Sequence, residues 1–277
     1  MTNDESTPHI AVAQSNTPAS AARGRTWPWV ILLLAALAFG AYFRLVGLDW
    51  SEGNPLHPDE NFLTMVTTSL KPPENLGAYF NSQTSTLNPY NNGYGLFVYG
   101  DLPIFITRYT ADLLDSLCTA VPQTCPTRNN VPFHFADYAG IVLLGRALSA
   151  LLDLFTLLFM FAIGRRLYGT RVGVLAALLG AATVLQIQQS HFYTADIFAT
   201  FFVMAAFYFI IRFGDSNSWP DVIASGAASG LAMASRINVA PILGIVGIAA
   251  LAHVFRQWRQ TDRTATFESA IARIVVA

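Results

Sequence analysis

The stretch WVILLLAALAFGAYFRLVGL, Trp29–Leu48, decides the fold of this chain. About twenty mainly apolar residues in a helix span roughly 30 Å, which is the thickness of the hydrocarbon core of a bilayer. A few residues later the segment Leu56–Glu60 (LHPDE) brings two adjacent carboxylates, Asp59 and Glu60, to the predicted membrane surface. They open a long polar segment instead of a second span. Acidic side chains next to hydrocarbon are costly, so they indicate a functional site, such as a base that meets a lipid-borne substrate.

The composition places much of the remaining chain in the membrane as well. Its 277 residues are 53% hydrophobic and 12% charged, with a mean hydropathy of +0.42, whereas soluble domains are about 25% charged. The net charge of −1 argues against a nucleic-acid partner. Residues 1–26 are polar with few large apolar side chains, so we predict a disordered cytoplasmic tail followed by an uncleaved membrane anchor.

We predict an all-α polytopic membrane protein with about six to seven transmembrane helices. The first helix lies within residues 27–48, a large extracytoplasmic loop follows over 49–138, and a transmembrane bundle occupies 139–277. A further helix begins near Phe267 and the chain stops inside it, so we expect a bundle that is truncated at its C-terminus. The predicted spans of the bundle are 139–163, 172–187, 195–211, 222–235 and 240–255.

Two segments of the large loop, Glu60–Leu70 and Leu102–Leu117, have amphipathic patterns. They are predicted to be interfacial helices, with the helices of a small soluble cap as the alternative. The loop also holds both cysteines of the chain, Cys118 and Cys125. They either pair in an oxidising compartment or stay free thiols, and the sequence leaves both outcomes open.

The distribution of arginines orients the bundle. Clusters lie before the first span, between the second and third spans, after the fourth span, and after residues 240–255. If the N-terminus is cytoplasmic, every cluster falls on the cytoplasmic side, as the positive-inside rule requires. Asp59, Glu60 and Asp196 then share the extracytoplasmic side. The arginines concerned are Arg23, Arg25, Arg165, Arg166, Arg171, Arg212, Arg256, Arg259 and Arg263.

The apolar stretch Val222–Ser235 is short for a membrane span, because it reaches only roughly 21 Å as a helix. Arg236 and Asn238 follow it directly, so we predict that they lie below the outer surface, where a charge needs protein neighbours or water. Arg236 is a candidate for binding a lipid phosphate. The alternative is a longer, tilted helix from which Arg236 snorkels to the interface.

Several polar residues admit a structural explanation beside a functional one. Asp59, Glu60 and Asp196 are also suited to the first turn or the cap of a helix. Arg146 and Asp153 share one face of the second span, where structural ion pairs with neighbouring helices explain them as well as a functional role does.

Two further features of the sequence allow more than one interpretation. The run Asn88–Pro103 contains Tyr94 and Tyr99 and suits stacking and hydrogen bonding to a sugar, although an ordinary loop shares this composition. His57 and His191 are able to bind a divalent metal together with the carboxylates, but no close spacing of ligands supports this alternative.

Three elements of the chain together resemble glycosyltransferase family 39, a group of C-type integral-membrane glycosyltransferases that includes protein O-mannosyltransferases and the lipid A aminoarabinose transferase. LHPDE at Leu56–Glu60 resembles the acidic motif of the first outer loop. GRALS at Gly145–Ser149 and GRRLYG at Gly164–Gly169 are similar to the second span and its cytoplasmic end. QSHFYTAD at Gln189–Asp196 resembles the second acidic site, and the similarity covers about residues 44–241.

The resemblance implies an enzyme that moves a sugar from a polyprenyl-phosphate carrier to an acceptor hydroxyl on a protein or a glycolipid, with inversion at the anomeric carbon. It implies that Asp59 is the base, that Glu60 supports it, and that Asp196 is the second carboxylate. Arg236 corresponds to a basic residue that faces the carrier phosphate. The predicted substrate-binding residues are His57, Arg236, Asn238, Arg146, Tyr94 and Tyr99.

The resemblance also implies partners and a location. The partners are membrane lipid, the polyprenyl-phosphate sugar donor and the acceptor, and no cofactor is expected. We expect a multi-pass protein of the cell membrane with its active site on the extracytoplasmic side. Family members have more spans than this chain, so we expect a fragment. A transporter or flippase with Arg146, Asp153 and Arg236 along its path, or an inactive scaffold, is the alternative, although no inverted repeat supports a transporter.

Overall fold

The protein is represented by a computed structural model, which describes residues 27–128, 131–216 and 218–260. The predicted cytoplasmic tail over 1–26 and the further helix near Phe267 lie outside the described residues. Within them the regular secondary structure is almost entirely helical, with one short two-stranded sheet, which confirms an all-α polytopic membrane protein.

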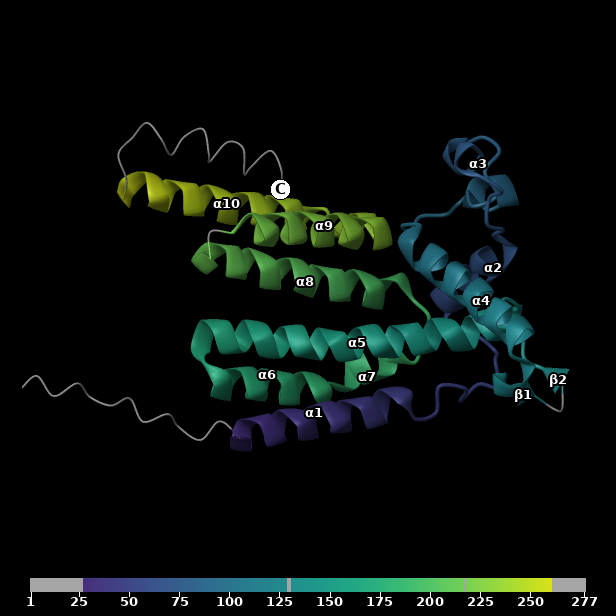
Figure 1. Ribbon diagram of the computed structural model, residues 1–277, viewed down its shortest axis with the longest axis horizontal. Helices are drawn as coiled ribbons and strands as arrows, with labels where there is room; N and C mark the ends of the chain where they lie inside the picture. The colour runs from purple at the N-terminus through teal and green to yellow at the C-terminus, as the bar shows by residue number, and fades with distance from the viewer. Residues whose placement is uncertain (1–26, 129–130, 217, 261–277) are drawn as a thin grey trace, which may run out of the picture.

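Long helices lie side by side and form the body of the molecule (Figure 1). The helix α5 is central, because it contacts α1, α6, α7 and α8 in the bundle as well as α2 and α4 of the large loop. On the other side, α8 packs against α9, and α10 packs on both. The helices of the bundle are α1 (Trp27–Leu45), α5 (Tyr138–Tyr168), α6 (Thr170–Ala181), α7 (Val184–Ser190), α8 (Ala195–Ser216), α9 (Trp219–Ser235) and α10 (Pro241–Gln260).

Each predicted span coincides with a helix, but the count of membrane-crossing helices differs from the prediction. In the described part of the chain, the three helices α1, α5 and α8 are long and apolar enough to cross a membrane. A fourth span results if α6 and α7, which meet at a bend of 59°, count as one. The predicted spans over 222–235 and 240–255 correspond to α9, which has 17 residues, and to the shorter apolar stretch 237–253.

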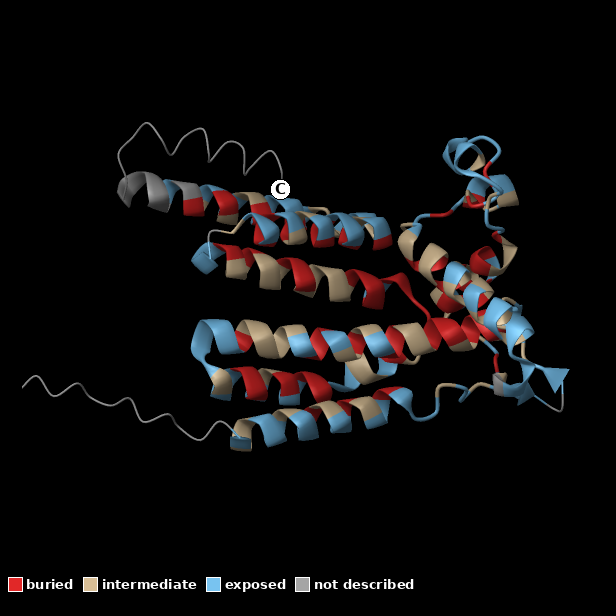
Figure 2. Ribbon diagram, in the orientation of Figure 1, coloured by how far each residue is buried: buried red, intermediate tan, exposed pale blue. Residues whose placement is uncertain are grey.

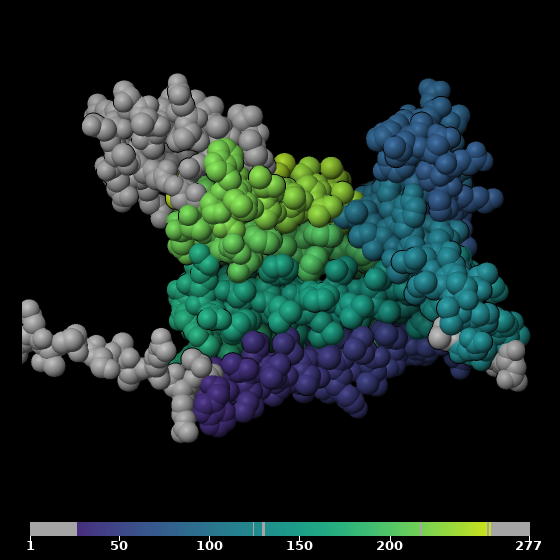
Figure 3. All heavy atoms as spheres, in the orientation of Figure 1, coloured from purple at the N-terminus to yellow at the C-terminus, as the bar shows by residue number. Residues whose placement is uncertain are grey.

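The large loop folds into a lobe at one end of the bundle (Figure 3). Its short two-stranded sheet pairs Thr127 with Pro132, and Cys118 and Cys125 form a disulfide, which resolves the alternative that the sequence left open. The predicted helices over 60–70 and 102–117 correspond to α2 and α4. The elements of the lobe are α2 (Pro58–Ser69), α3 (Leu76–Phe80), η1 (Pro89–Asn92), α4 (Leu102–Ala120), η2 (Pro122–Thr124), β1 (Thr127–Arg128) and β2 (Val131–Pro132).

The lobe and the ends of several helices meet at one end of the bundle. The first residues of α5 and α8 and the last residues of α9 lie at this end, whereas the α5–α6 and α8–α9 turns lie at the opposite end (Figure 1). Buried residues concentrate where the first half of α5 meets α2 and α4 (Figure 2). The two acidic motifs, although far apart in sequence, are therefore brought to the same end.

A buried ion pair joins α1 to α5 within the bundle. The Arg44 Nε atom lies 2.6 Å from an Asp153 carboxylate oxygen, and both side chains are at most 3% exposed. The remaining Arg44 nitrogens donate to the carbonyl oxygens of Gly40, Gly180 and Ala181. These carbonyls include the last turn of α6, so the arginine connects three helices. Asp153 thus pairs with Arg44 and not with a side chain on its own helix.

Replacement of Arg44 by methionine should destabilise the fold. The Asp153 carboxylate would stay buried without its partner, which costs about 3 kcal/mol or more. The free energy of unfolding, measured in mixed micelles with increasing detergent denaturant, should fall by that amount. The exposed pair Arg166–Asp215 provides the control, because Arg166→Met should lower the free energy by less than about 1 kcal/mol. Equal effects of the two replacements would contradict a structural role of Arg44.

Candidate active site

The acidic motif forms the first turn of α2. His57 is the N-cap residue, and its Nδ1 atom accepts a hydrogen bond from the Asp59 backbone N–H at 3.2 Å. Pro58 occupies the first helical position, where its missing N–H and fixed φ angle favour a helix start. Asp59 and Glu60 are consecutive residues, so their side chains project about 100° apart around the helix axis. The two acids therefore have different surroundings.

Glu60 points into the protein and forms a buried ion pair with Arg146 of α5. The Arg146 Nε and Nη2 atoms donate to the two carboxylate oxygens at 2.7 and 2.8 Å, and both side chains are fully buried. Arg146 also donates to the carbonyl oxygens of Leu48 and Asn54, and Glu60 accepts from the Tyr193 backbone N–H. Neither charged group has a surface that a substrate is able to reach.

This geometry gives two predicted site residues a structural contact. Glu60, predicted to support the base, and Arg146, predicted to bind substrate, hold α2 and the preceding loop against α5. A charged side chain leaves water only when its hydrogen bonds are replaced, and here both Glu60 oxygens and all three Arg146 side-chain nitrogens bond to protein atoms. The contact agrees with the alternative of a structural ion pair between Arg146 and a neighbouring helix, with Glu60 of α2 as the partner.

Asp59 faces the opposite direction, toward Tyr99 in the segment that precedes α4. The Tyr99 hydroxyl donates a hydrogen bond to the Asp59 carboxylate. Burial, this hydrogen bond and the negative charge of Asp59 together raise the pKa of Tyr99 to about 12, against the opposing effect of the Arg236 charge. Tyr99 therefore remains protonated at neutral pH and remains a donor to Asp59. Asp59 itself is partly exposed, so its other carboxylate positions are open to a ligand.

Arg236 connects Tyr99 with the second acidic motif. Its guanidinium carbon lies 6.0 Å from the centre of the Tyr99 ring, and its Nη1 atom forms an ion pair with the Asp196 carboxylate at the start of α8. The side chains of Arg236 and Asp196 are 28% and 50% exposed. The connected residues Asp59, Tyr99, Arg236 and Asp196, which we call the acid cluster, thus join both motifs and come from four segments of the sequence.

The backbone explains how Arg236 enters this cluster. Helix α9 ends at Ser235, Arg236 is extended with φ −155° and ψ 115°, and the short η3 helix (Ile237–Val239) follows. The side chain therefore leaves a helix end and pairs with protein, which excludes the alternative of a longer helix with a snorkelling arginine. Asn238, a predicted substrate-binding residue, lies exposed in η3, close in sequence to Arg236.

A close backbone contact holds Tyr99 beside Arg236. The Gly100 N–H donates to the Ser235 carbonyl oxygen at 3.1 Å. A Cβ atom at Gly100 would lie 1.9 Å from the Ala234 carbonyl oxygen, so no other residue fits at this separation. Sequence reasoning missed Gly100, since a glycine in a loop gives no sign of which segment it will contact.

The remaining predicted residues support the site from its edges. The His57 ring packs against the Phe192 ring in a tilted arrangement, at 5.1 Å between ring centres, and the His191 ring nitrogens contact the carbonyl oxygens of Ile187 and Val46. The Tyr94 hydroxyl donates to the Met65 carbonyl oxygen, so Tyr94 packs on α2. Within the described residues, no three side chains of His, Cys, Asp or Glu are placed to share a metal ion.

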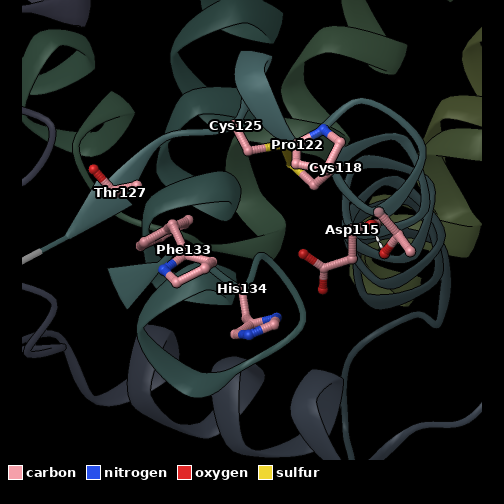
Figure 4. A pocket seen from close by; sticks show the side chains of 9 residues that line it. Asp115, Cys118, Pro122, Cys125, Thr127, Phe133 and His134 are labelled. Carbon is pink, nitrogen blue, oxygen red and sulfur yellow. Dashed lines mark hydrogen bonds between the residues drawn. A yellow bond between two sulfur atoms is a disulfide. The ribbon is translucent and has the colours of Figure 1, made fainter. Parts of the chain in front are cut away.

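A separate cavity of about 250 Å³ lies beside the disulfide at the far end of α4 (Figure 4). Asp115 on its wall accepts hydrogen bonds from the backbone N–H groups of Phe135 and Ala136, and thereby fixes the segment that leads into α5. About 24 Å of helix separates this cavity from the start of α4, near the acid cluster. We assign the cavity to the structure of the lobe.

A comparison with protein-family models finds a match to part of the chain. Residues 143–277 match the family described as dolichyl-phosphate-mannose-protein mannosyltransferase, which confirms the resemblance to glycosyltransferase family 39. The match includes Asp196 and Arg236, whereas Asp59 and Tyr99 precede it. Searches of curated proteins and of solved structures find no match.

Replacement of Gly100 by alanine should detach the segment of Tyr99 from α9, because the added Cβ atom would collide with backbone. Hydrogen exchange over residues 94–101 should become about tenfold faster or more, since the amide of residue 100 loses its partner. Gly95→Ala is the matched control, as a Cβ atom there meets no atom within 4 Å. Unchanged exchange in the Gly100 variant would disprove the close contact.

Proposed function

We propose that this chain, a membrane glycosyltransferase of the family 39 type, moves a sugar from a polyprenyl-phosphate carrier to an acceptor hydroxyl with inversion at the anomeric carbon. The observation that carries the proposal is the acid cluster. It combines a partly exposed carboxylate, a neutral phenol and an arginine at the end of the bundle where apolar helices meet a polar lobe. A lipid-linked substrate requires such a position, with its chain in the bilayer and its sugar in water.

Asp59 is the proposed base. As the acceptor oxygen attacks the anomeric carbon, its proton passes to Asp59, and the bond between that carbon and the phosphate oxygen breaks. The electron pair of the broken bond remains on the phosphate. Attack from the face opposite the phosphate inverts the anomeric centre. The Tyr99 hydroxyl orients Asp59 by its hydrogen bond and, because its pKa is about 12, does not compete as a base near neutral pH.

Arg236 is proposed to stabilise the leaving phosphate. A guanidinium has five N–H donors, and the ion pair with Asp196 leaves most of them free for a second acidic group. Donors directed at the charge that develops on a leaving group lower the barrier of the reaction. We therefore assign Asp196 to orienting Arg236, a change from its expected place as a second carboxylate at the reacting atoms.

The competing proposal, a transporter or flippase, needs charged groups along a path through the bundle. Arg146 and Asp153, which were candidates for this path, are both buried in ion pairs with Glu60 and Arg44. Such pairs join helices and leave no charge for a solute. The third candidate, Arg236, lies in the acid cluster at the end of the bundle. The described residues therefore favour an enzyme.

The proposed partners follow from this chemistry. They are membrane lipid around the apolar helices, a polyprenyl-phosphate sugar donor at Arg236, and a protein or glycolipid acceptor at Asp59. The chain is a multi-pass membrane protein. We propose the cell membrane as its location, with the acid cluster on the extracytoplasmic side.

Asp59→Asn should abolish transfer while it preserves donor binding. An amide keeps the size of the side chain but accepts no proton, so the rate should fall by about a hundredfold to ten-thousandfold. Transfer is measured with a radiolabelled polyprenyl-phosphate sugar and a panel of hydroxyl acceptors. Glu74→Gln, a change of the same kind at an exposed residue of the lobe, is the control and should keep full activity. Normal turnover of the Asp59 variant would refute the assignment.

Arg236→Ala should weaken donor binding by about tenfold to a hundredfold, the effect of a lost charge-assisted contact to phosphate. Asp196→Asn should weaken it less, because the arginine stays present but is less well held. Binding is measured by competition between the labelled donor and unlabelled carrier phosphate. Arg128→Ala, at an exposed arginine of the lobe, is the control. A donor affinity that does not depend on Arg236 would exclude it as the phosphate ligand.

A further inference from the structure

A second hollow lies on the lobe, beside the start of α4. Its volume is about 360 Å³, and it is open to solvent. Residues 72–107, which supply its lining, contain no lysine, arginine or histidine, and Glu74 and Asp101 are their only acids. The lining residues are Tyr79, Ser82, Ser85, Leu87, Asn88, Tyr90, Asp101 and Phe105.

Asp101 is the charged group of this hollow. It directly precedes α4, where an aspartate normally caps the helix, but its side chain makes no capping hydrogen bond. Among the described residues, none is found to donate a hydrogen bond to its carboxylate. Burial also raises the pKa of its carboxyl group above the ordinary value. The carboxylate is therefore available to a ligand that donates hydrogen bonds.

Side-chain amides hold part of the lining of this hollow in shape. Asn88 accepts from the Tyr90 backbone N–H, and its Nδ2 atom donates to the Ser82 carbonyl oxygen at 2.7 Å. Asn91 donates to the carbonyl oxygens of Ser82 and Ser85, and the Tyr90 hydroxyl donates to the Phe97 carbonyl oxygen. The hollow is thus formed before any ligand binds, which lowers the entropy that binding must overcome.

The lining matches one ligand class better than others. Tyr79 and Tyr90 are 39% and 58% exposed, so their rings offer aromatic surface to the C–H face of a sugar. Hydroxyl and carboxylate side chains accept and donate hydrogen bonds as sugar hydroxyls require. A phosphate or an acidic headgroup would be repelled by the Asp101 carboxylate, because the lining offers no cation. An extended peptide would need a free sheet edge or an apolar groove, and neither forms this lining.

We propose that this hollow is an acceptor subsite that binds a sugar residue. This inference rests on the proposed function and narrows its acceptor, which would carry a sugar next to the hydroxyl that reacts. Tyr99 and Asp101 are two residues apart, so their Cα atoms lie at most about 7 Å from each other. Tyr99 contacts Asp59, and Asp101 lines the hollow. A sugar in the hollow would therefore bring its neighbouring group to the base.

Saturation-transfer NMR on the full chain in lipid nanodiscs tests the subsite. The probes are methyl α-mannopyranoside, methyl β-glucopyranoside and methyl β-N-acetylglucosaminide, with an unglycosylated serine-rich and threonine-rich peptide as the competing class. At least one glycoside should receive saturation. Asp101→Asn should weaken its binding about tenfold, a loss typical of a hydrogen bond to a charged group. Tyr79→Leu should weaken it as well, through the loss of the ring face.

Matched variants separate this proposal from the proposed reaction. Glu74→Gln removes the other acid of the same segment and should leave binding unchanged, and Asp59→Asn should abolish transfer yet keep glycoside binding. Absence of saturation for all glycosides, or binding that is insensitive to both Asp101→Asn and Tyr79→Leu, would overturn the subsite. Binding of the peptide in place of the glycosides, lost in Asp101→Asn, would overturn its assignment to a sugar. None of these outcomes depends on transfer activity.

Discussion

The buried ion pair between Glu60 and Arg146 is the interaction on which the site depends. It attaches the first turn of α2 to the middle of the bundle, and its remaining hydrogen bonds reach the loop after α1 and the Tyr193 backbone before α8. Three segments are thereby fixed relative to one another at a single point. Removal of either partner would leave a buried charge without compensation, so the pair has to remain complete. This requirement sets the direction of Asp59, the neighbour of Glu60.

Tyr193 extends the same junction toward the lobe. It is fully buried, and its hydroxyl contacts the Thr67 hydroxyl of α2 and donates to the Pro103 carbonyl oxygen of α4. A Cβ atom at Gly145 would lie 2.3 Å from the Tyr193 ring, so a glycine on α5 makes room for it. Tyr193 is therefore one of the buried side chains that pack the lobe onto the bundle. Tyr99 reaches Arg236 only because α2 and α4 are both held in this way.

The adjacent acids Asp59 and Glu60 have different roles for a simple physical reason. Side chains of consecutive helical residues project in different directions, so one carboxylate is able to support the fold while the next faces a substrate. Tyr99 and Asp101, which flank Gly100 on one short segment, also have different surroundings. Tyr99 belongs to the acid cluster and contacts Asp59, whereas Asp101 lines the second hollow. The segment around Gly100 therefore contributes one residue to the acid cluster and one to the proposed acceptor subsite.

The sequence by itself determined the helices and the end of the bundle at which the acids lie, because apolar length and hydrophobic pattern are local properties. It also determined the residues Asp59, Asp196 and Arg236 of the acid cluster. Only the tertiary structure decided the partners: Asp153 with Arg44, Glu60 with Arg146, and Asp196 with Arg236. It likewise decided the pairing of the cysteines and the contact of Gly100 with α9. Hydrogen bonds and ion pairs between distant segments depend on how helices pack, and a local pattern of residue types does not specify that packing.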